Sequence, residues 1–228
     1  MTNENDISND LKEKRVAILI DGDNAQSALM EQIVVEASRY GNATIRRIYG
    51  DWTSSSMKSW KDTLNSFAFQ PFQQFAYSVG KNSTDSAMII DAMDILYTGR
   101  VDGFCIVSSD SDFTRLAIRL RESGMKVFGF GEKKTPDPFI VACDKFIYLE
   151  ILKSTPLPES AQTQQSAKNK AVVSDGIQKV DPKTVSLIRS TVDDIADEDG
   201  WAFLGDVGSL LIKKKPDFDP RNYGFEKL

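Results

Sequence analysis

The strongest constraint on the fold is an alternation of short apolar runs with amphipathic stretches of helical length, which continues from Arg15 to about Leu152. Strand-like and helix-like segments that alternate in this way are typical of a parallel sheet whose strands are joined by crossover helices. At 228 residues, the chain is long enough for one such domain and a small additional unit. We therefore expect a three-layer α/β domain over residues 15–152.

The apolar runs place five strands and a short sixth, at residues 16–20, 44–49, within 67–77, 103–107, 126–130 and 145–149. The intervening periodic stretches predict helices at residues 25–40, 57–64, 85–97 and 112–123. The last two helices have the clearest starts, because N-cap candidates precede each of them: Ser83 or Thr84, and Ser109 or Asp110.

The composition changes after residue 152. Residues 153–180 are rich in Ser, Gln, Ala and Lys and free of aromatic residues, so they cannot bury much apolar surface, and we expect a flexible linker there. Residues 1–14 are polar and are also expected to be flexible. Helical periodicity returns at residues 185–195, which predicts a compact second unit over residues 181–228 with core candidates Trp201, Phe203, Leu204, Leu210 and Leu211.

The composition also excludes several chemistries. The chain contains no histidine, which rules out Ser-His-Asp and Cys-His catalysis and histidine-ligated zinc. An enzyme with this composition must use carboxylates, lysine, hydroxyls or a metal ion held by oxygen ligands. The formal net charge of −5 argues against a generally basic nucleic-acid-binding surface, although local basic patches remain open.

The N-terminus and the cysteines favour a cytoplasmic protein. The first residues are polar and acidic, unlike a secretory signal, and no apolar run reaches the roughly 18 residues that span a bilayer. Cys105 and Cys143 each lie among apolar neighbours, where a free thiol behaves as a small hydrophobic group. We expect free thiols in a reducing compartment, with a bond between the two left open.

Two expected strands each end in a pair of aspartates. Asp21 and Asp23 follow the first strand, and Asp110 and Asp112 follow the fourth. In an open parallel sheet wound both ways, the first and fourth strands commonly lie side by side where the strand order reverses, and a crevice forms there. The two pairs are therefore expected to face each other at the carboxyl ends of these strands.

A further carboxylate is expected from the start of the helix that leads into the fourth strand. Asp85 lies at that start, so it should join the cluster, whereas Asp91 is six positions further on and could reach the site only from the next turn. For any single aspartate, the alternative is an ordinary helix cap or turn residue. That alternative is weaker for both strand-end pairs and Asp85 together.

Carboxylates that converge in a crevice repel one another, and a divalent cation relieves the repulsion. Oxygen ligands alone favour Mg²⁺ or Mn²⁺ over zinc or copper. Such an ion can hold a phosphodiester, activate a water molecule for attack and stabilise the departing oxygen. The aspartate pattern therefore predicts metal-dependent phosphodiester hydrolysis.

Three segments resemble the motifs of the NYN (LabA-like, PIN-like) domain family: VAILIDGDN, KNSTDSAMIIDAMDILY and DGFCIVSSDSDFTRLAIRLRESGMKVFGFG. The resemblance covers about residues 16–149 and includes motif order and spacing. It implies a Rossmann-like fold of the PIN type and Mg²⁺- or Mn²⁺-dependent RNA cleavage. It also implies that Asp21, Asp85 and Asp110 occupy the principal acidic positions and Asp112 the usual fourth.

The same resemblance implies roles for further residues. Asn24 and Ser109 fall on polar positions that orient ligands or phosphate, and Lys81 falls on a frequent basic position that could contact phosphate. Asp91 matches a recurrent helix aspartate, and Asp23 lies where family members vary, so both are additional metal-site candidates. Ser109 also departs from the pattern, because a glycine more usually precedes the first aspartate of that motif.

The C-terminal stretch from about Asp181 resembles the beginning of a LOTUS (OST-HTH) domain, a winged-helix module that binds RNA or protein partners. We expect a partial, helical unit that lacks the wing and the closing elements. Basic residues in this unit and around the expected site are candidate RNA contacts, with ordinary exposed charge as the alternative: Lys213, Lys214, Lys215, Arg221, Arg46, Arg47, Arg115, Arg119, Lys133 and Lys134.

Two other functions remain open beside the ribonuclease. The first is a non-catalytic adaptor that keeps the nuclease fold and binds RNA or protein. The second is a phosphatase of the haloacid-dehalogenase type, because Asp21 and Asp23 have the spacing of an aspartyl nucleophile and its general acid. Ala25 stands where that second pattern has a threonine, which disfavours it.

Overall fold

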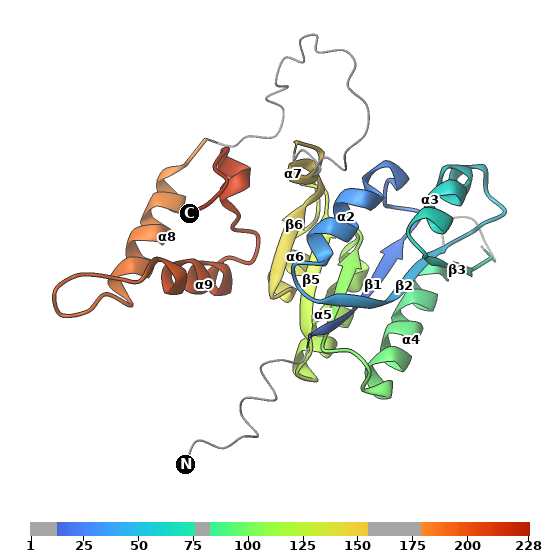
Figure 1. The fold of residues 1–228 in the computed structure, drawn as a ribbon, viewed down its shortest axis with the longest axis horizontal. Helices are drawn as coiled ribbons and strands as arrows, with labels where there is room; N and C mark the ends of the chain where they lie inside the picture. The colour runs from blue at the N-terminus through green and yellow to red at the C-terminus, as the bar shows by residue number, and fades with distance from the viewer. Residues whose placement is uncertain (1–12, 76–82, 155–178) are drawn as a thin grey trace, which may run out of the picture.

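The computed structural model describes residues 13–75, 83–154 and 179–228. In these ranges six strands form one all-parallel sheet in the order β3-β2-β1-β4-β5-β6 (Figure 1). The strands are β1 (Arg15–Asp21), β2 (Asn42–Gly50), β3 (Gln70–Gln73), β4 (Gly103–Val107), β5 (Lys126–Gly131) and β6 (Lys145–Tyr148). The predicted pairing of the first and fourth strands is confirmed, and the strand order reverses between them.

Helices cover both faces of the sheet, which confirms the predicted three-layer architecture. Along β1, Ala17 and Leu19 face the layer of α4 (Ser83–Thr98), α5 (Thr114–Glu122) and α6 (Asp137–Ala142). Ile18, together with Val16 and Ile20, faces the layer of α2 (Met30–Ala37), α3 (Lys61–Ser66) and α7 (Leu149–Ser154). Because both faces are covered, every residue of β4 is buried, as expected for a central parallel strand.

The structure differs from the predicted elements mainly in its short segments. The helix expected at residues 25–40 is a 3₁₀ turn, η1 (Ser27–Leu29), followed by α2. The helix expected at residues 57–64 is likewise η2 (Ser55–Trp60) followed by α3. Helices α6 and α7 were not predicted, because six residues cover less than two turns and show no clear helical period.

The C-terminal unit consists of α8 (Pro182–Asp193), α9 (Leu204–Lys214) and η4 (Pro220–Tyr223). Its buried centre is formed by Val207, Leu211 and Phe218. The prediction that Trp201, Phe203 and Leu204 belong to the core is wrong, because these side chains are 77%, 75% and 58% exposed. Leu210 is only partly buried.

The turn that precedes α9 explains this error. Asp197 accepts hydrogen bonds through Oδ1 from the backbone N–H groups of Asp199 and Trp201, and Gly200 adopts the left-handed conformation with a φ of 81°. Such a turn needs short polar side chains and glycine. It leaves Trp201 on the outer surface of the unit, a placement that apolar periodicity could not reveal.

The C-terminal unit is docked against the β6 edge of the sheet (Figure 1). The backbone N–H of Phe146 in β6 donates to the carbonyl of Pro216 at 2.9 Å, and the Tyr148 hydroxyl donates to Asp217 at 2.9 Å. Arg221 also donates two 2.9 Å hydrogen bonds to the carboxylate of Glu36 in α2, a side chain that is almost fully buried. We call this last contact the Arg221–Glu36 clasp.

The clasp keeps Glu36 ionised inside the protein. Burial alone raises the pKa of this carboxyl, but the hydrogen bonds and positive charge of Arg221 outweigh it and lower the pKa below its usual value. Asp219 flanks the same guanidinium and accepts a 2.7 Å hydrogen bond from it. The two units are thus joined by a largely buried ion pair.

Both cysteines are free thiols in the structure. Cys105 and Cys143 are buried free thiols, and they belong to the cores on opposite faces of the sheet. The expectation of free thiols is confirmed. Within the described ranges, no helix is both long and apolar enough to cross a membrane.

The clasp gives a testable prediction about stability. Arg221→Ala leaves the Glu36 carboxylate without its buried partner, so the free energy of unfolding in urea should fall by about 3 kcal/mol. Arg189→Ala, which removes an exposed arginine from α8, should change it by less than about 0.5 kcal/mol. Equal, small effects of both substitutions would show that the clasp does not join the units.

Candidate metal centre

Asp21 is the fixed point of the site. It ends β1 and is fully buried, and its carboxylate accepts hydrogen bonds from the Asn24 side chain at 2.7 Å and from the Ser108 hydroxyl at 2.8 Å. The backbone N–H groups of Asp23 and Asn24 also donate to it, at 3.2 and 3.3 Å. Four donors hold this carboxylate in one orientation, which a site for a cation requires of its acidic groups.

Three other aspartates bring their carboxylates together beside Asp21. Asp85 lies in the first turn of α4, Asp110 is the N-cap of the 3₁₀ turn η3 (Ser111–Phe113), and Asp112 lies within that turn. One carboxylate oxygen from each lies within 4.8 Å of the others. We call these three residues the carboxylate cluster.

Local structure explains how the cluster forms. The Asp110 carboxylate accepts the backbone N–H of Asp112 at 2.9 Å, which closes the turn after β4 and directs both aspartates to the same edge of the sheet. The start of α4 is tied to the end of β1 because the Thr84 hydroxyl donates to Asp23 at 2.8 Å. Asp85, the next residue, is thereby brought to the same edge.

The electrostatics of the cluster favour a bound cation. Burial raises the pKa of Asp85, and the charges of Asp21, Asp110 and Asp112 raise it further, to about 7. Burial also raises the pKa of Asp21, although the hydrogen bonds from Asn24 and Ser108 oppose this. A divalent cation among these oxygens would remove the repulsion that raises the pKa of Asp85.

The donor set fits Mg²⁺ or Mn²⁺. All the groups that converge are carboxylates, which are the ligands that hard divalent cations take in proteins. Asp85 is buried, Asp110 is half-buried and Asp112 is exposed, so the cluster has one side open to solvent where a substrate phosphate could approach. Asp21 lies outside the group of three but close enough to affect the pKa of Asp85.

Other predicted site residues have different surroundings. Asp91 does not join the cluster: its carboxylate accepts hydrogen bonds from Arg47 and from the Tyr49 hydroxyl on β2. It lies almost two turns along α4 from Asp85, which explains the separation. Asn24 orients Asp21, and the Ser109 hydroxyl accepts the backbone N–H of Glu132 at 2.8 Å. Lys81 lies outside the described residues.

Two residues that hold the site together, Ser108 and Thr84, were not predicted as site residues. Ser108 is buried and orients Asp21, and Thr84 orients Asp23. A hydroxyl residue directly after a fully apolar strand was the available signal for Ser108. No pattern could have shown that Thr84, predicted only as a helix cap, bonds to a residue 61 positions away.

Most of the basic RNA-contact candidates are already used in contacts within the protein. Arg46 donates to two backbone carbonyls, and Arg119 donates to Ser123 and Tyr97. Ion pairs engage Arg47 with Asp91, Lys134 with Glu132, Lys214 with Asp194, and Arg221 with Glu36. Arg115 is exposed in the first turn of α5, three residues after Asp112.

Comparisons with known proteins identify the families that the two units match. The NYN domain family model matches residues 15–150, and the OST-HTH/LOTUS domain family model matches residues 176–228. An uncharacterized protein of Methanocaldococcus jannaschii, MJ0482, is 27% identical over 123 residues, which are 52% of this chain and 48% of that protein. The chain thus spans about half the length of this relative.

Two solved structures have a limited likeness to this chain. A protein of unknown function from Vibrio parahaemolyticus, VPA0982, has a TM-score of 0.49 and 21% identity, and the match covers 59% of this chain and 91% of that one. MurG of Acinetobacter baumannii has a TM-score of 0.39 and 11% identity, over 67% of this chain and 44% of that one. Neither likeness is high enough to indicate function.

The parallel sheet with acidic groups at the carboxyl ends of β1 and β4 defines an α/β domain of the nuclease-like, PIN type. The chain belongs to the NYN domain family, and it carries an OST-HTH/LOTUS domain after the NYN domain. NYN domains are generally nucleases that depend on divalent metal ions. Membership therefore implies a nuclease-like function related to RNA, and both domains indicate RNA binding.

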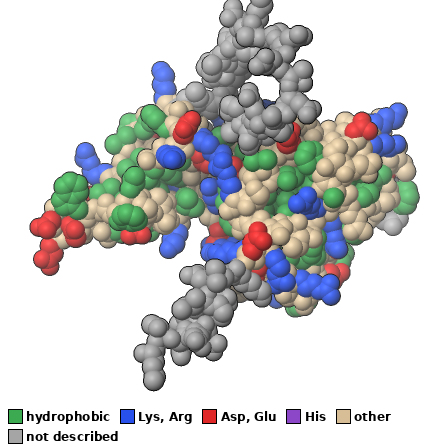
Figure 2. All heavy atoms as spheres, in the orientation of Figure 1, with side chains coloured by type: hydrophobic (Ala, Val, Ile, Leu, Met, Phe, Trp, Pro, Cys, Tyr) green, Lys and Arg blue, Asp and Glu red, His purple; other side chains and the backbone are tan. Residues whose placement is uncertain are grey.

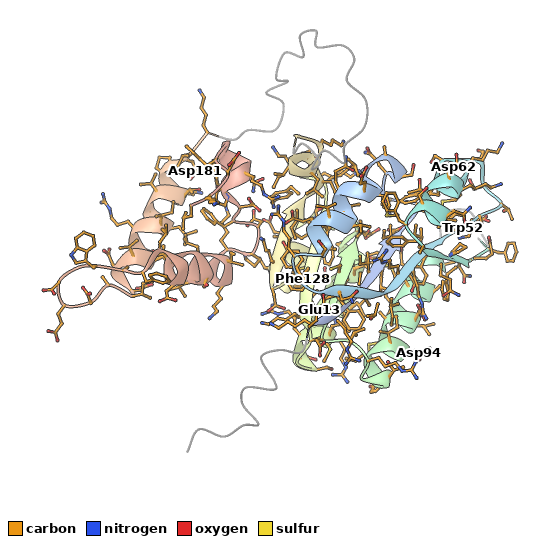
Figure 3. The ribbon with its side chains drawn as sticks, viewed as in Figure 1. Glu13, Trp52, Asp62, Asp94, Phe128 and Asp181 are labelled. Carbon is orange, nitrogen blue, oxygen red and sulfur yellow. The ribbon has the colours of Figure 1, made fainter. Side chains whose placement is uncertain are left out.

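The raised pKa of Asp85 predicts pH-dependent metal binding. The carboxyl must lose its proton to ligate a cation, so with a pKa of about 7 the dissociation constant for Mn²⁺ should be about tenfold higher at about pH 6 than at about pH 8. Calorimetry in buffers of different ionisation enthalpy should detect proton release near neutral pH. Asp94 is exposed in the later half of α4 (Figure 3), so the Asp94→Asn variant should keep this pH dependence. A wild-type affinity for Mn²⁺ that does not change with pH would contradict the raised pKa of Asp85.

The same repulsion predicts that Asp85→Asn stabilises the metal-free protein. Because the folded-state pKa of Asp85 lies above the usual value of 3.8, the fold disfavours its ionised form, and stability falls as pH rises from about 4 through about 7. In chelator at about pH 8, the substitution should raise the free energy of unfolding by about 1 kcal/mol or more. Mn²⁺ should then stabilise the wild type more than the variant. A less stable Asp85→Asn protein in chelator would contradict the electrostatic account.

Proposed function

We propose that this protein is a ribonuclease that hydrolyses RNA phosphodiester bonds with Mg²⁺ or Mn²⁺ as cofactor. The observation that carries the proposal is the carboxylate cluster, in which oxygens of Asp85, Asp110 and Asp112 lie within 4.8 Å of one another beside the buried Asp21. In a chain without histidine, these carboxylates are the groups best suited to phosphodiester chemistry.

We assign the reaction to four residues. Asp85, Asp110 and Asp112 hold the cation, and Asp21 adds negative charge from the end of β1. When bound, a divalent ion lowers the pKa of an attacking water molecule and offsets charge on the phosphate oxygens. The proton on Asp85 at neutral pH must leave before the cation is fully held, because a protonated carboxyl is a poor ligand.

Other side chains keep these groups in place or face the substrate. Ser108 and Asn24 orient Asp21 through hydrogen bonds, and Thr84 holds Asp23 near the start of α4. These are positioning residues rather than catalytic ones. Arg115 is the described basic residue best placed to contact an RNA phosphate, since it lies one helical turn after Asp112 with its side chain exposed.

The proposal extends to the organisation of the chain. We assign the nuclease unit to residues 15–152, a linker to residues 153–180 and the LOTUS-like unit to residues 181–228. Lys153 and Ser154 still belong to α7, and residues 155–178 of the linker lie outside the described part of the chain. The exposed Trp201 and Phe203 are large apolar groups that suit contact with a protein partner, in addition to RNA. The two buried free thiols fit a cytoplasmic location.

The direct test is cleavage of labelled single-stranded RNA by the purified chain. We expect products with Mn²⁺ or Mg²⁺ and none with chelator. Asp110→Asn should lower the rate by about 100-fold or more, because it removes a charged ligand. Asp94→Asn serves as the matched control: it makes the same chemical change at an exposed position on α4 and should keep wild-type activity.

The alternatives give different outcomes in the same assay. RNA that is bound but stays intact with either metal would overturn the ribonuclease and favour the non-catalytic adaptor. Phosphate release from small monoesters, with a covalent intermediate on Asp21, would favour the phosphatase. Equal activity of the Asp110→Asn and Asp94→Asn variants would place the reaction outside the carboxylate cluster.

A further inference from the structure

A crevice of about 480 Å³ lies between the two units, at the opposite edge of the sheet from the carboxylate cluster. One side is lined at the starts of the strands, by Val16, Gly103 and Lys126, and the other by Ser209, Ile212 and Lys213 of α9. Strands of five to seven residues separate this edge from the aspartates, which corresponds to roughly 17–23 Å. The crevice is therefore a different place from the proposed metal centre.

Docking of the C-terminal unit creates the crevice, and that docking is well defined. The Arg221–Glu36 clasp, the Tyr148–Asp217 hydrogen bond and the backbone bond from Phe146 to Pro216 all connect the two units. Pockets of about this volume, between about 300 and 1,000 Å³, at the interface of two units are common ligand sites.

The crevice has an excess of positive charge although the chain as a whole carries a formal charge of −5, and Arg39, one of its lining cations, pairs with Glu36 at 3.4 Å. Its lining includes two carboxylates and five cations: Lys14, Arg39, Lys126, Lys145 and Lys213. Figure 2 shows blue basic side chains gathered between the two lobes of the molecule. An excess of positive charge between two surfaces attracts anions.

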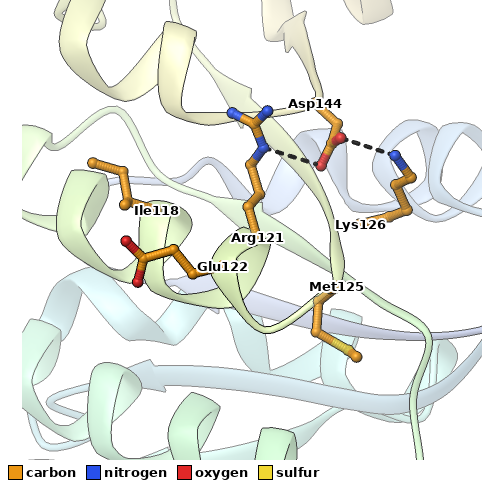
Figure 4. Close-up of a pocket in the computed structure, with 7 residues that line it drawn as sticks. Ile118, Arg121, Glu122, Met125, Lys126 and Asp144 are labelled. Atoms are coloured by element: carbon orange, nitrogen blue, oxygen red, sulfur yellow. Dashed lines mark hydrogen bonds and ion pairs between the residues drawn. The ribbon is translucent and has the colours of Figure 1, made fainter.

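Both lining carboxylates are already paired. Asp144 lies between Arg121 and Lys126, as the dashed lines in Figure 4 show, and its two oxygens are 3.6 and 3.0 Å from their nitrogens. Asp102 accepts a hydrogen bond from the backbone N–H of Arg15 at 2.7 Å. It also forms an ion pair with the guanidinium of Arg15, at 3.7 Å. These two acids therefore offset little of the charge on the remaining lysines.

Lys145 is the most informative of those lysines. Its side chain is partly buried, and its ammonium lies over the ring of Tyr40, 5.4 Å from the centroid. Within the ranges that the structure describes, no carboxylate forms an ion pair with it, because the nearby Glu36 and Asp219 are held by Arg221. A cation withdrawn from water without an anionic partner is costly, and a bound anion would compensate it.

Apart from Ser209, the uncharged side chains of the lining are apolar, and two of them are aromatic. Tyr40 and Phe128 stack with their ring centroids 4.1 Å apart, and Ile212 contributes from α9. Phe128, labelled in Figure 3, lies on the side of the sheet that faces the C-terminal unit. Apolar walls beside several cations suit a ligand that has a flat, weakly polar part and phosphate groups.

We propose that this crevice is a second binding site, which takes a phosphate-bearing ligand of nucleotide size through Lys14, Lys145 and Lys213. The ligand is either a free nucleotide or a nucleotide within an RNA strand, since both present the same phosphate chemistry. The proposal does not rest on cleavage at the carboxylate cluster, because it concerns a separate place and a binding event.

The test is binding to the full chain in chelator, where the proposed cleavage cannot occur. The probes are ADP, measured by calorimetry, and a short labelled oligoadenylate, measured by fluorescence anisotropy. Lys213→Ala and Lys145→Ala should each weaken binding by about fivefold or more, since each removes a phosphate contact. Circular dichroism and thermal melting of each variant establish that it is folded.

Lys214→Ala is the matched control. Lys214 is the next residue on α9, but it pairs with Asp194 and does not line the crevice, so its loss should change affinity by less than about twofold. Asp110→Asn should bind ADP as the wild type does, because the carboxylate cluster lies at the other edge of the sheet. This control separates failure of the crevice proposal from failure of the ribonuclease proposal.

Each outcome decides the proposal. Binding of ADP that Lys213→Ala and Lys145→Ala weaken would support a free-nucleotide site. Binding of the oligoadenylate alone, weakened by the same two variants, would support a site for RNA. No binding of either probe, or equal binding by the wild type and both crevice variants, would overturn it.

Discussion

The pairing of β1 with β4 is the constraint on which the rest of this structure depends. In an all-parallel sheet the carboxyl ends of neighbouring strands lie at one edge, so Asp21 and Ser108 meet across the pair although they are 87 residues apart. The start of α4 is then bonded to the end of β1 through Thr84 and Asp23. These connections place Asp85 against Asp110 and Asp112, where the burial of Asp85 and the repulsion between carboxylates raise its pKa. The proposed cation site rests on that geometry.

The central elements of the fold could be predicted because their signals are local. The apolar runs of β1 and β4 and the long periodic stretch of α4 are found where the sequence predicts them. The convergence of aspartates followed from topology, since the ends of adjacent parallel strands share an edge. Asp110 was expected beside Asp21 from the order of the strands, and Asp85 because the helix that it begins leads into the fourth strand.

The remaining features depend on long-range contacts that no local pattern encodes. Asp91 was predicted as an additional metal-site candidate, yet its carboxylate binds Arg47 and Tyr49 on β2. Trp201 is apolar, yet a turn held by Asp197 leaves it exposed. Arg221 was a candidate for RNA contact, but it forms the buried clasp to Glu36. In each case a partner distant in the sequence, or a specific turn, determines the environment of the side chain.

The two edges of the sheet thus carry opposite charge. The carboxyl edge concentrates aspartates, and the amino edge, covered in part by the LOTUS domain, concentrates lysines.

The proposed cation site is tested most directly by a crystal grown or soaked with Mn²⁺ at slightly alkaline pH, with anomalous diffraction recorded near the manganese edge. We expect a peak about 2.0–2.2 Å from oxygens of Asp85, Asp110 and Asp112. Absence of a peak there, with these carboxylates bonded only to protein groups, would contradict it.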